Sequence, residues 1–79
     1  MEGEHLIQMA NQIGSFFAAE PDRPAALEGI ANHLHRFWDP RMRKQIIALL
    51  DEKHEGFMPL VEEAIRTNRE RLLAFKTRQ

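Results

Sequence analysis

The chain reads RFWDPRMR over residues 36–43, and this stretch contains the sharpest break in its pattern. Asp39 is a favourable N-cap residue, and Pro40 suits the first position of a helix because its missing N–H has no intrahelical partner there. Pro40 also ends the preceding helix, since a residue before proline disfavours the α conformation. The stretch therefore predicts that one helix stops and another begins with almost no loop between them.

Apolar residues recur on both sides of this break with the spacing of an amphipathic helix. Before it stand Leu27, Ile30, Ala31, Leu34, Phe37 and Trp38. After it stand Met42, Ile46, Leu49 and Leu50, with Ile47 widening the apolar face. These two stripes predict one helix that begins at Asp22 or Arg23 and another that begins at Pro40.

Two further helices are expected at the ends of the chain. The first has the stripe Leu6, Met9, Ala10, Ile13, Phe16 and Phe17 and must end near Ala19, because Pro21 cannot continue it. Gly14 lies inside this helix, where glycine is unfavourable, so we expect a packing reason for it. The last helix begins at Pro59, after a polar break, with the stripe Val61, Ala64, Ile65 and Leu72.

The fold class that these segments predict is all-α: a compact bundle of three to four short helices. No strand-like alternation and no hairpin dipeptide interrupts the helical spacing. We expect residues 1–79 to form a single domain with a core over about residues 5–66 and a frayed helical tail at 67–79. A domain of this size buries little core, so a partner or self-association is a natural source of further stability.

Composition excludes several classes of site. The 79 residues include no cysteine, so the chain has no disulfide, thiolate nucleophile or cysteine-ligated cluster. His33 and His35 are two apart, which places them on different sides of a helix, and the glycines are too scattered for a phosphate loop. We therefore expect no catalytic residue, no metal site and no cofactor bound by this chain.

The charge pattern favours a protein partner. The net charge is −1, but acidic segments at residues 1–35 and 45–65 alternate with basic segments at 36–44 and 66–79. Such alternation suits docking to another protein better than binding a polyanion, so we expect no nucleic-acid partner. The absence of cysteine suits a reducing compartment, so we expect a cytoplasmic protein. The acidic N-terminus argues against a signal peptide, and the absence of a long apolar run predicts no membrane partner.

The RFWDPRMR stretch is also the strongest candidate for a binding site. Its cations stand in the first turns of a helix, where they oppose the helix dipole, and a broken local rule invites a functional explanation. A carboxylate-rich protein surface or a bound phosphate would explain them. The alternative is that Phe37 and Trp38 are core residues and the arginines are solvated or locally paired. A second polar pattern, Asn11-Gln12 and Asn32-His33, is either an inter-helix hydrogen-bond pair or two solvated flanks.

At this point the sequence resembles a known family. The segments MANQIGSFF at residues 9–17, IANHL at 30–34 and RFWDPRMR at 36–43 resemble the delta subunit of soluble, molybdenum-containing, NAD-dependent formate dehydrogenase. The resemblance covers about residues 5–66. It implies a non-catalytic accessory subunit of a complex whose other subunits use a molybdenum cofactor, Fe–S clusters, FMN and NAD.

The resemblance and the broken helix rule together give a hypothesis about partners. We expect this chain to dock on the catalytic (alpha) subunit of formate dehydrogenase and so to support assembly, stability or molybdenum-cofactor maturation. The expected contact surface consists of Phe37, Trp38, Asp39, Arg41, Met42 and Arg43. In a variant of this hypothesis, the arginines contact a phosphate of the cofactor during insertion. The rival classes are a free-standing helical homo-oligomer, such as a homodimer, and a regulatory DNA-binding protein resembling a helix-turn-helix.

Overall fold

The computed structural model describes residues 3–74, which form five α-helices and no strand. They are α1 (Gly3–Phe17), α2 (Arg23–Phe37), α3 (Pro40–Asp51), α4 (Pro59–Thr67) and α5 (Arg69–Leu73). The predicted all-α class is confirmed. The part of the expected tail at residues 75–79 lies outside the described residues.

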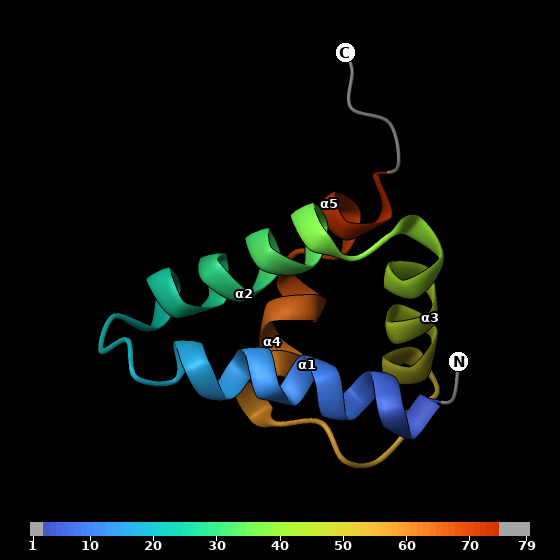
Figure 1. The fold of residues 1–79 in the computed structure, drawn as a ribbon, viewed down its shortest axis with the longest axis horizontal. Helices are drawn as coiled ribbons and strands as arrows, with labels where there is room; N and C mark the ends of the chain where they lie inside the picture. The colour runs from blue at the N-terminus through green and yellow to red at the C-terminus, as the bar shows by residue number, and fades with distance from the viewer. Residues whose placement is uncertain (1–2, 75–79) are drawn as a thin grey trace.

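The helices form a flat, two-layered molecule of 31 × 31 × 18 Å. Helices α1 and α2 pack side by side, and α4 crosses behind both in the view of Figure 1. Helix α3 packs against α1 and α5 at the other end of the molecule. A helix with its side chains is about 10–12 Å wide, so 18 Å leaves no room for a third layer over α1 and α2.

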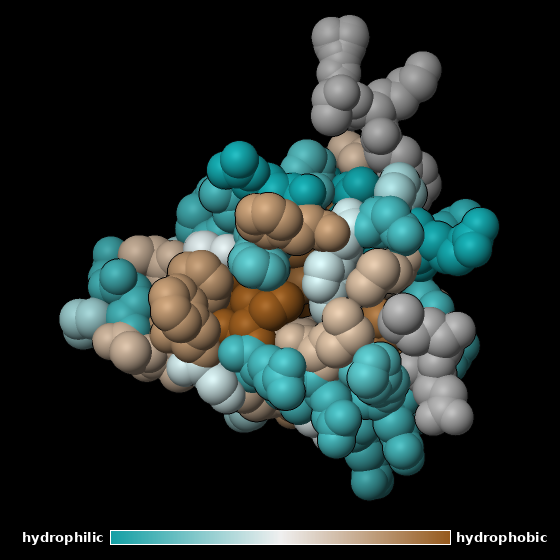
Figure 2. Space-filling view, viewed as in Figure 1, coloured by the Kyte–Doolittle hydropathy of each residue, from teal (hydrophilic) through white to brown (hydrophobic). Residues whose placement is uncertain are grey.

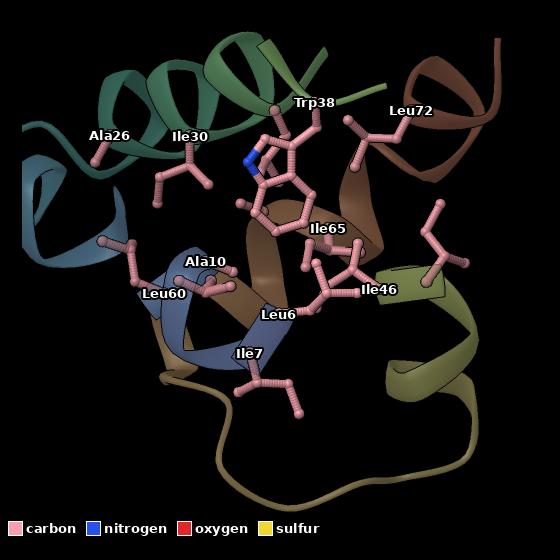
Figure 3. Close-up of a cluster of buried hydrophobic side chains, with 14 residues drawn as sticks. Leu6, Ile7, Ala10, Ala26, Ile30, Trp38, Ile46, Leu60, Ile65 and Leu72 are labelled. Atoms are coloured by element: carbon pink, nitrogen blue, oxygen red, sulfur yellow. The ribbon is translucent and has the colours of Figure 1, made fainter. Parts of the chain in front are cut away.

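The core lies where the apolar stripes of all five helices meet (Figure 3). Its largest fully buried side chains are Leu6, Ile30, Leu34, Ile46, Val61, Ile65 and Leu72. Each of them belongs to a stripe that the sequence predicts, because helical spacing places these residues on one side of their helix.

The predicted junction between α2 and α3 is confirmed. Helix α2 ends at Phe37, and the Oδ1 atom of Asp39 accepts a hydrogen bond of 2.8 Å from the backbone N–H of Met42. Pro40 occupies the first turn of α3. The N-cap side chain thus satisfies a backbone donor that the helix itself leaves unpaired.

The last predicted helix is interrupted at Asn68, which separates α4 from α5. The Asn68 backbone N–H and its Nδ2 atom both donate to the carbonyl oxygen of Ala64, at 3.2 and 2.9 Å. Asparagine side chains compete in this way with the helical ladder, which the apolar spacing alone does not reveal. Leu72 is nevertheless fully buried, so the core extends beyond the expected limit at residue 66.

Gly14 has the packing role that its sequence position suggests. A Cβ atom at this position would lie 2.4 Å from the Cγ2 atom of Val61, well inside van der Waals contact. Glycine is therefore required where α1 crosses α4. The close approach of these two helices helps to set the angle at which the second layer supports the first.

Of the two alternatives left open for Asn11-Gln12 and Asn32-His33, the inter-helix hydrogen-bond pair is not formed by the two asparagines. Asn11 instead holds the loop before α4: its Nδ2 atom donates to the Gly56 carbonyl at 2.8 Å, and its Oδ1 atom accepts from the Met58 N–H at 3.0 Å. Asn32 accepts a hydrogen bond of 2.9 Å from Arg71 in α5. Each asparagine serves a segment far along the chain, and a pattern of polar residues cannot indicate which one.

Candidate protein interaction surface

The structure divides the predicted contact residues into two groups. Phe37, Asp39 and Arg41 face outward, and 69 % of Phe37 is exposed. Trp38 and Arg43 are buried, and Met42 is partly buried against the core. At the helix junction, therefore, some of the predicted contact residues face the core and others face solvent.

Arg43 connects α3 to α5. Its Nη1 atom donates to the carbonyl oxygens of Leu72 and Ala74, at 3.0 and 3.1 Å. These carbonyls lie at the C-terminal end of α5, where a cation is favourable. Arg43 thus has a structural role that explains one of the cations in the first turns of α3.

A hollow with a volume of about 470 Å³ lies on the face that no third layer covers. Brown, hydrophobic surface gathers around it between α1 and α2 in Figure 2. Its lining comes from α1, α2 and the junction after α2, and consists of Met9, Gln12, Ile13, Phe16, Phe17, His33 and Trp38. An apolar hollow of this size, with a few polar groups, is typical of a site that accepts another molecule.

Trp38 is the main link between the core and this hollow. Only 6 % of the residue is exposed, yet it contributes to the lining, and its indole nitrogen points toward the space between α1 and α2 (Figure 3). Within residues 3–74, no group accepts a hydrogen bond from this nitrogen. The hollow therefore contains a hydrogen-bond donor that is available to a partner.

Phe16 is a surface residue that the sequence analysis placed in the apolar stripe. It is 76 % exposed, whereas the adjacent Phe17 is partly buried, and their rings meet edge to face with centroids 5.1 Å apart. Phe17 packs against the core, and Phe16, about 100° away around the helix, faces solvent. The apolar spacing alone does not distinguish them, because neighbouring residues such as Leu6 and Ile7 are both buried.

Phe37 contacts His33, which lines the hollow. The rings of these two residues, one turn apart on α2, have centroids 4.8 Å apart, and His33 itself lines the hollow. The Arg36 guanidinium lies 5.8 Å from the centroid of the Phe37 ring, a cation–π contact. We call Phe16, Phe37 and the hollow together the apolar face.

The arginines near the apolar face differ from those elsewhere. Four arginines form ion pairs with carboxylates: Arg23, Arg66, Arg69 and Arg71. Among residues 3–74, no carboxylate lies within ion-pair distance of Arg36 or Arg41. These two cations stand on either side of Phe37 in the sequence, at the corner between α2 and α3.

Residues 3–74 contain neither a cluster of metal-binding side chains nor a helix that could span a membrane. No group of three or more His, Cys, Asp or Glu side chains there could hold a metal ion. None of the five helices is long and apolar enough to cross a membrane.

Comparison with known families gives one match. Residues 5–65 of the 79-residue chain match the family model described as the NADH-dependent formate dehydrogenase delta subunit FdsD. Searches of curated proteins and of solved structures returned no match to the chain.

Proposed function

Because the chain belongs to the delta-subunit family of NADH-dependent formate dehydrogenase, we propose that it docks on the catalytic (alpha) subunit of that complex. In this role it is an accessory subunit that supports assembly, stability or molybdenum-cofactor maturation and performs no chemistry itself. A subunit of a complex has partner subunits, and the proposal assigns which one this chain contacts and what the contact does.

The observation that carries the proposal is the exposure of Phe16 and Phe37 beside an apolar hollow. Transfer of a large apolar side chain out of water lowers the free energy by about 25 cal/mol for each Å² that is buried. A small domain that leaves two phenylalanines in solvent on one face thus has a surface suited to a protein partner. Aromatic residues around a pocket are also typical of the centres of protein interfaces.

The proposed contact surface revises the one expected from the sequence. Phe37, Asp39 and Arg41 remain as outward-facing members. Trp38 contributes through the hollow, and Met42 supports it from the partly buried layer. Phe16 is added because of its exposure. Arg43 is left out because its guanidinium binds α5.

The test is a pull-down of the tagged chain from cells that also produce the other subunits of the dehydrogenase. We expect wild type to recover the catalytic subunit at near-equal stoichiometry, and Phe16→Ser with Phe37→Ser to lose at least tenfold in recovery. Ala48→Ser, on the exposed side of α3, is the matched control. Circular dichroism must show that all variants fold. Recovery of the catalytic subunit at wild-type levels by the double variant would contradict the proposal.

Substitution of Arg41 distinguishes a role in docking from a role in cofactor insertion. With Arg43 buried, Arg41 is the exposed arginine left from the predicted pair. If Arg41→Ala assembles normally but yields enzyme with reduced molybdenum content, a maturation role is supported. Wild-type assembly, molybdenum content and formate oxidation would together exclude a function for Arg41.

The rival classes predict different behaviour of the isolated chain. A homodimer that closes over the apolar face would melt at a temperature that rises with protein concentration. A DNA-binding protein would retard DNA in a gel at low salt and release it at high salt. Either result, without recovery of any dehydrogenase subunit, would replace the proposal.

A further inference from the structure

We propose that the apolar face accepts an acidic segment of the partner subunit, which inserts an apolar side chain into the hollow and places carboxylates against Arg36 and Arg41. This inference rests on the proposed function, and it adds the chemistry of the element that the chain recognises. Three features of the described residues support it: the shape of the face, the Trp38 donor within it, and its charge.

The shape of the face suits a side chain that enters between α1 and α2. The hollow of about 470 Å³ has an apolar lining, and Phe16 and Phe37 stand exposed beside it. The two-layered fold leaves this side without a covering helix. An aromatic or branched aliphatic anchor would replace the water now in contact with these residues, as anchors do at the centre of interfaces.

The donor within the hollow requires an acceptor from the partner. Within residues 3–74 the Trp38 indole N–H has no hydrogen-bond partner, and it points into the space between α1 and α2. Covering this group without an acceptor would carry the cost of an unsatisfied buried donor. The inserted segment therefore needs an oxygen beside its anchor, from a carbonyl, a hydroxyl or a carboxylate.

The positive charge at the corner between α2 and α3 favours a partner segment with negative charge. Arg36 and Arg41 lack carboxylates in residues 3–74, whereas Arg23, Arg66 and Arg71 have them. Arg36 lies against the exposed Phe37 ring, and Arg41 is exposed in the first turn of α3, just after the same helix junction. Such guanidinium groups favour carboxylates on the partner, which give orientation and faster association.

The same charges disfavour two other occupants. A symmetric homodimer uses the same surface of both copies, so it would bring two sets of Arg36 and Arg41 into one interface. A nucleic acid would satisfy the guanidinium groups through its phosphates, but its backbone offers no apolar anchor for the hollow. The combination of an apolar hollow with a cationic corner therefore favours an acidic protein segment.

The test measures binding of the purified chain to the purified catalytic subunit by biolayer interferometry at low and high salt. We expect Arg36→Glu and Arg41→Glu each to weaken binding at least tenfold at low salt, mainly through slower association. Arg66→Glu is the matched control: it makes the same charge change at an exposed position of α4, and we expect at most a twofold effect on binding. Trp38→Phe keeps an aromatic ring without the N–H and should weaken binding about threefold to tenfold.

Each outcome decides between the two proposals. If wild type does not bind the catalytic subunit, the proposed function fails and this inference fails with it. If Phe16→Ser and Phe37→Ser weaken binding but Arg36→Glu and Arg41→Glu behave like Arg66→Glu, docking stands and the acidic segment is overturned. If the two charge reversals instead promote self-association of the chain, the occupant is a second copy.

Discussion

Arg43, in the first turns of α3, donates a hydrogen bond of 3.0 Å to the carbonyl oxygen of Leu72 in α5. The two residues are 29 positions apart, and the contact is buried. It fastens the last helix to the body of the fold at the point where Leu72 enters the core. A cation that appears misplaced at the start of one helix thus lies at the favourable end of another.

Replacing Arg43 with methionine should therefore destabilise the protein. The change keeps much of the side-chain length but leaves the Leu72 and Ala74 carbonyls without this donor, at a cost of about 2–4 kcal/mol in the free energy of unfolding. Urea denaturation measures the loss. Arg41→Met, on the exposed side of the same helix, should change stability by no more than about 0.5 kcal/mol. Equal effects of the two substitutions would contradict the role assigned to Arg43.

Gly14→Ala should destabilise the protein although alanine is the better helix former. The added methyl group would meet Val61 at 2.4 Å, and the branched valine has little freedom to move away. We expect a net loss of about 1–2 kcal/mol, because overpacking exceeds the gain in helix propensity. Combining it with Val61→Ala should show a favourable coupling energy in a double-mutant cycle followed by thermal unfolding. Strict additivity would show that the two sites do not meet.

Asn11→Ala should loosen the loop that precedes α4. The substitution removes the donor to the Gly56 carbonyl and the acceptor for the Met58 N–H, with an expected cost of about 1–3 kcal/mol. Hydrogen exchange of the Met58 amide should rise in parallel, since its partner is lost. Gln8→Ala, exposed on the same helix, serves as the control and should leave both measurements near wild type. Unchanged protection at Met58 in Asn11→Ala would refute the assignment.

The ion pair between Asp51 and Arg69 gives stability that depends on pH. Hydrogen bonds of 2.6 and 2.5 Å join the two side chains, and they lower the pKa of Asp51 and raise the pKa of Arg69. Because the folded pKa of Asp51 lies below its unfolded value of about 4, the contribution is present above pH 4 and disappears as pH falls through the folded pKa.

Comparing the stability of wild type with that of Asp51→Asn tests the direction of this pH dependence. Wild type should be the more stable at pH 7, by the small amount expected of an exposed pair, and the difference should vanish in acid. Arg69→Gln should return the pKa of Asp51 to its ordinary range, as measured by NMR titration of the carboxyl group. A stability difference that grows as the pH falls would have the wrong sign for the pair described here.

The first three helices and the start of the fourth were determined by the sequence itself. Asp39 and Pro40 establish the start of α3 through local hydrogen bonding and a restricted backbone. The apolar spacing identifies every large side chain that is fully buried, from Leu6 to Leu72, but not the buried Ile7 and Leu60. Such features depend on residues within one or two turns of each other.

Only the tertiary structure decided what the polar side chains and the uncovered face do. Arg43 and Asn11 find partners 29 to 47 positions away, and Asn68 breaks a helix that the apolar pattern would continue. Trp38 becomes both core and lining because the two-layered packing stops short of covering α1 and α2. Hydrogen-bond partners and exposed faces depend on how helices meet in space, and helical periodicity carries no information about that arrangement.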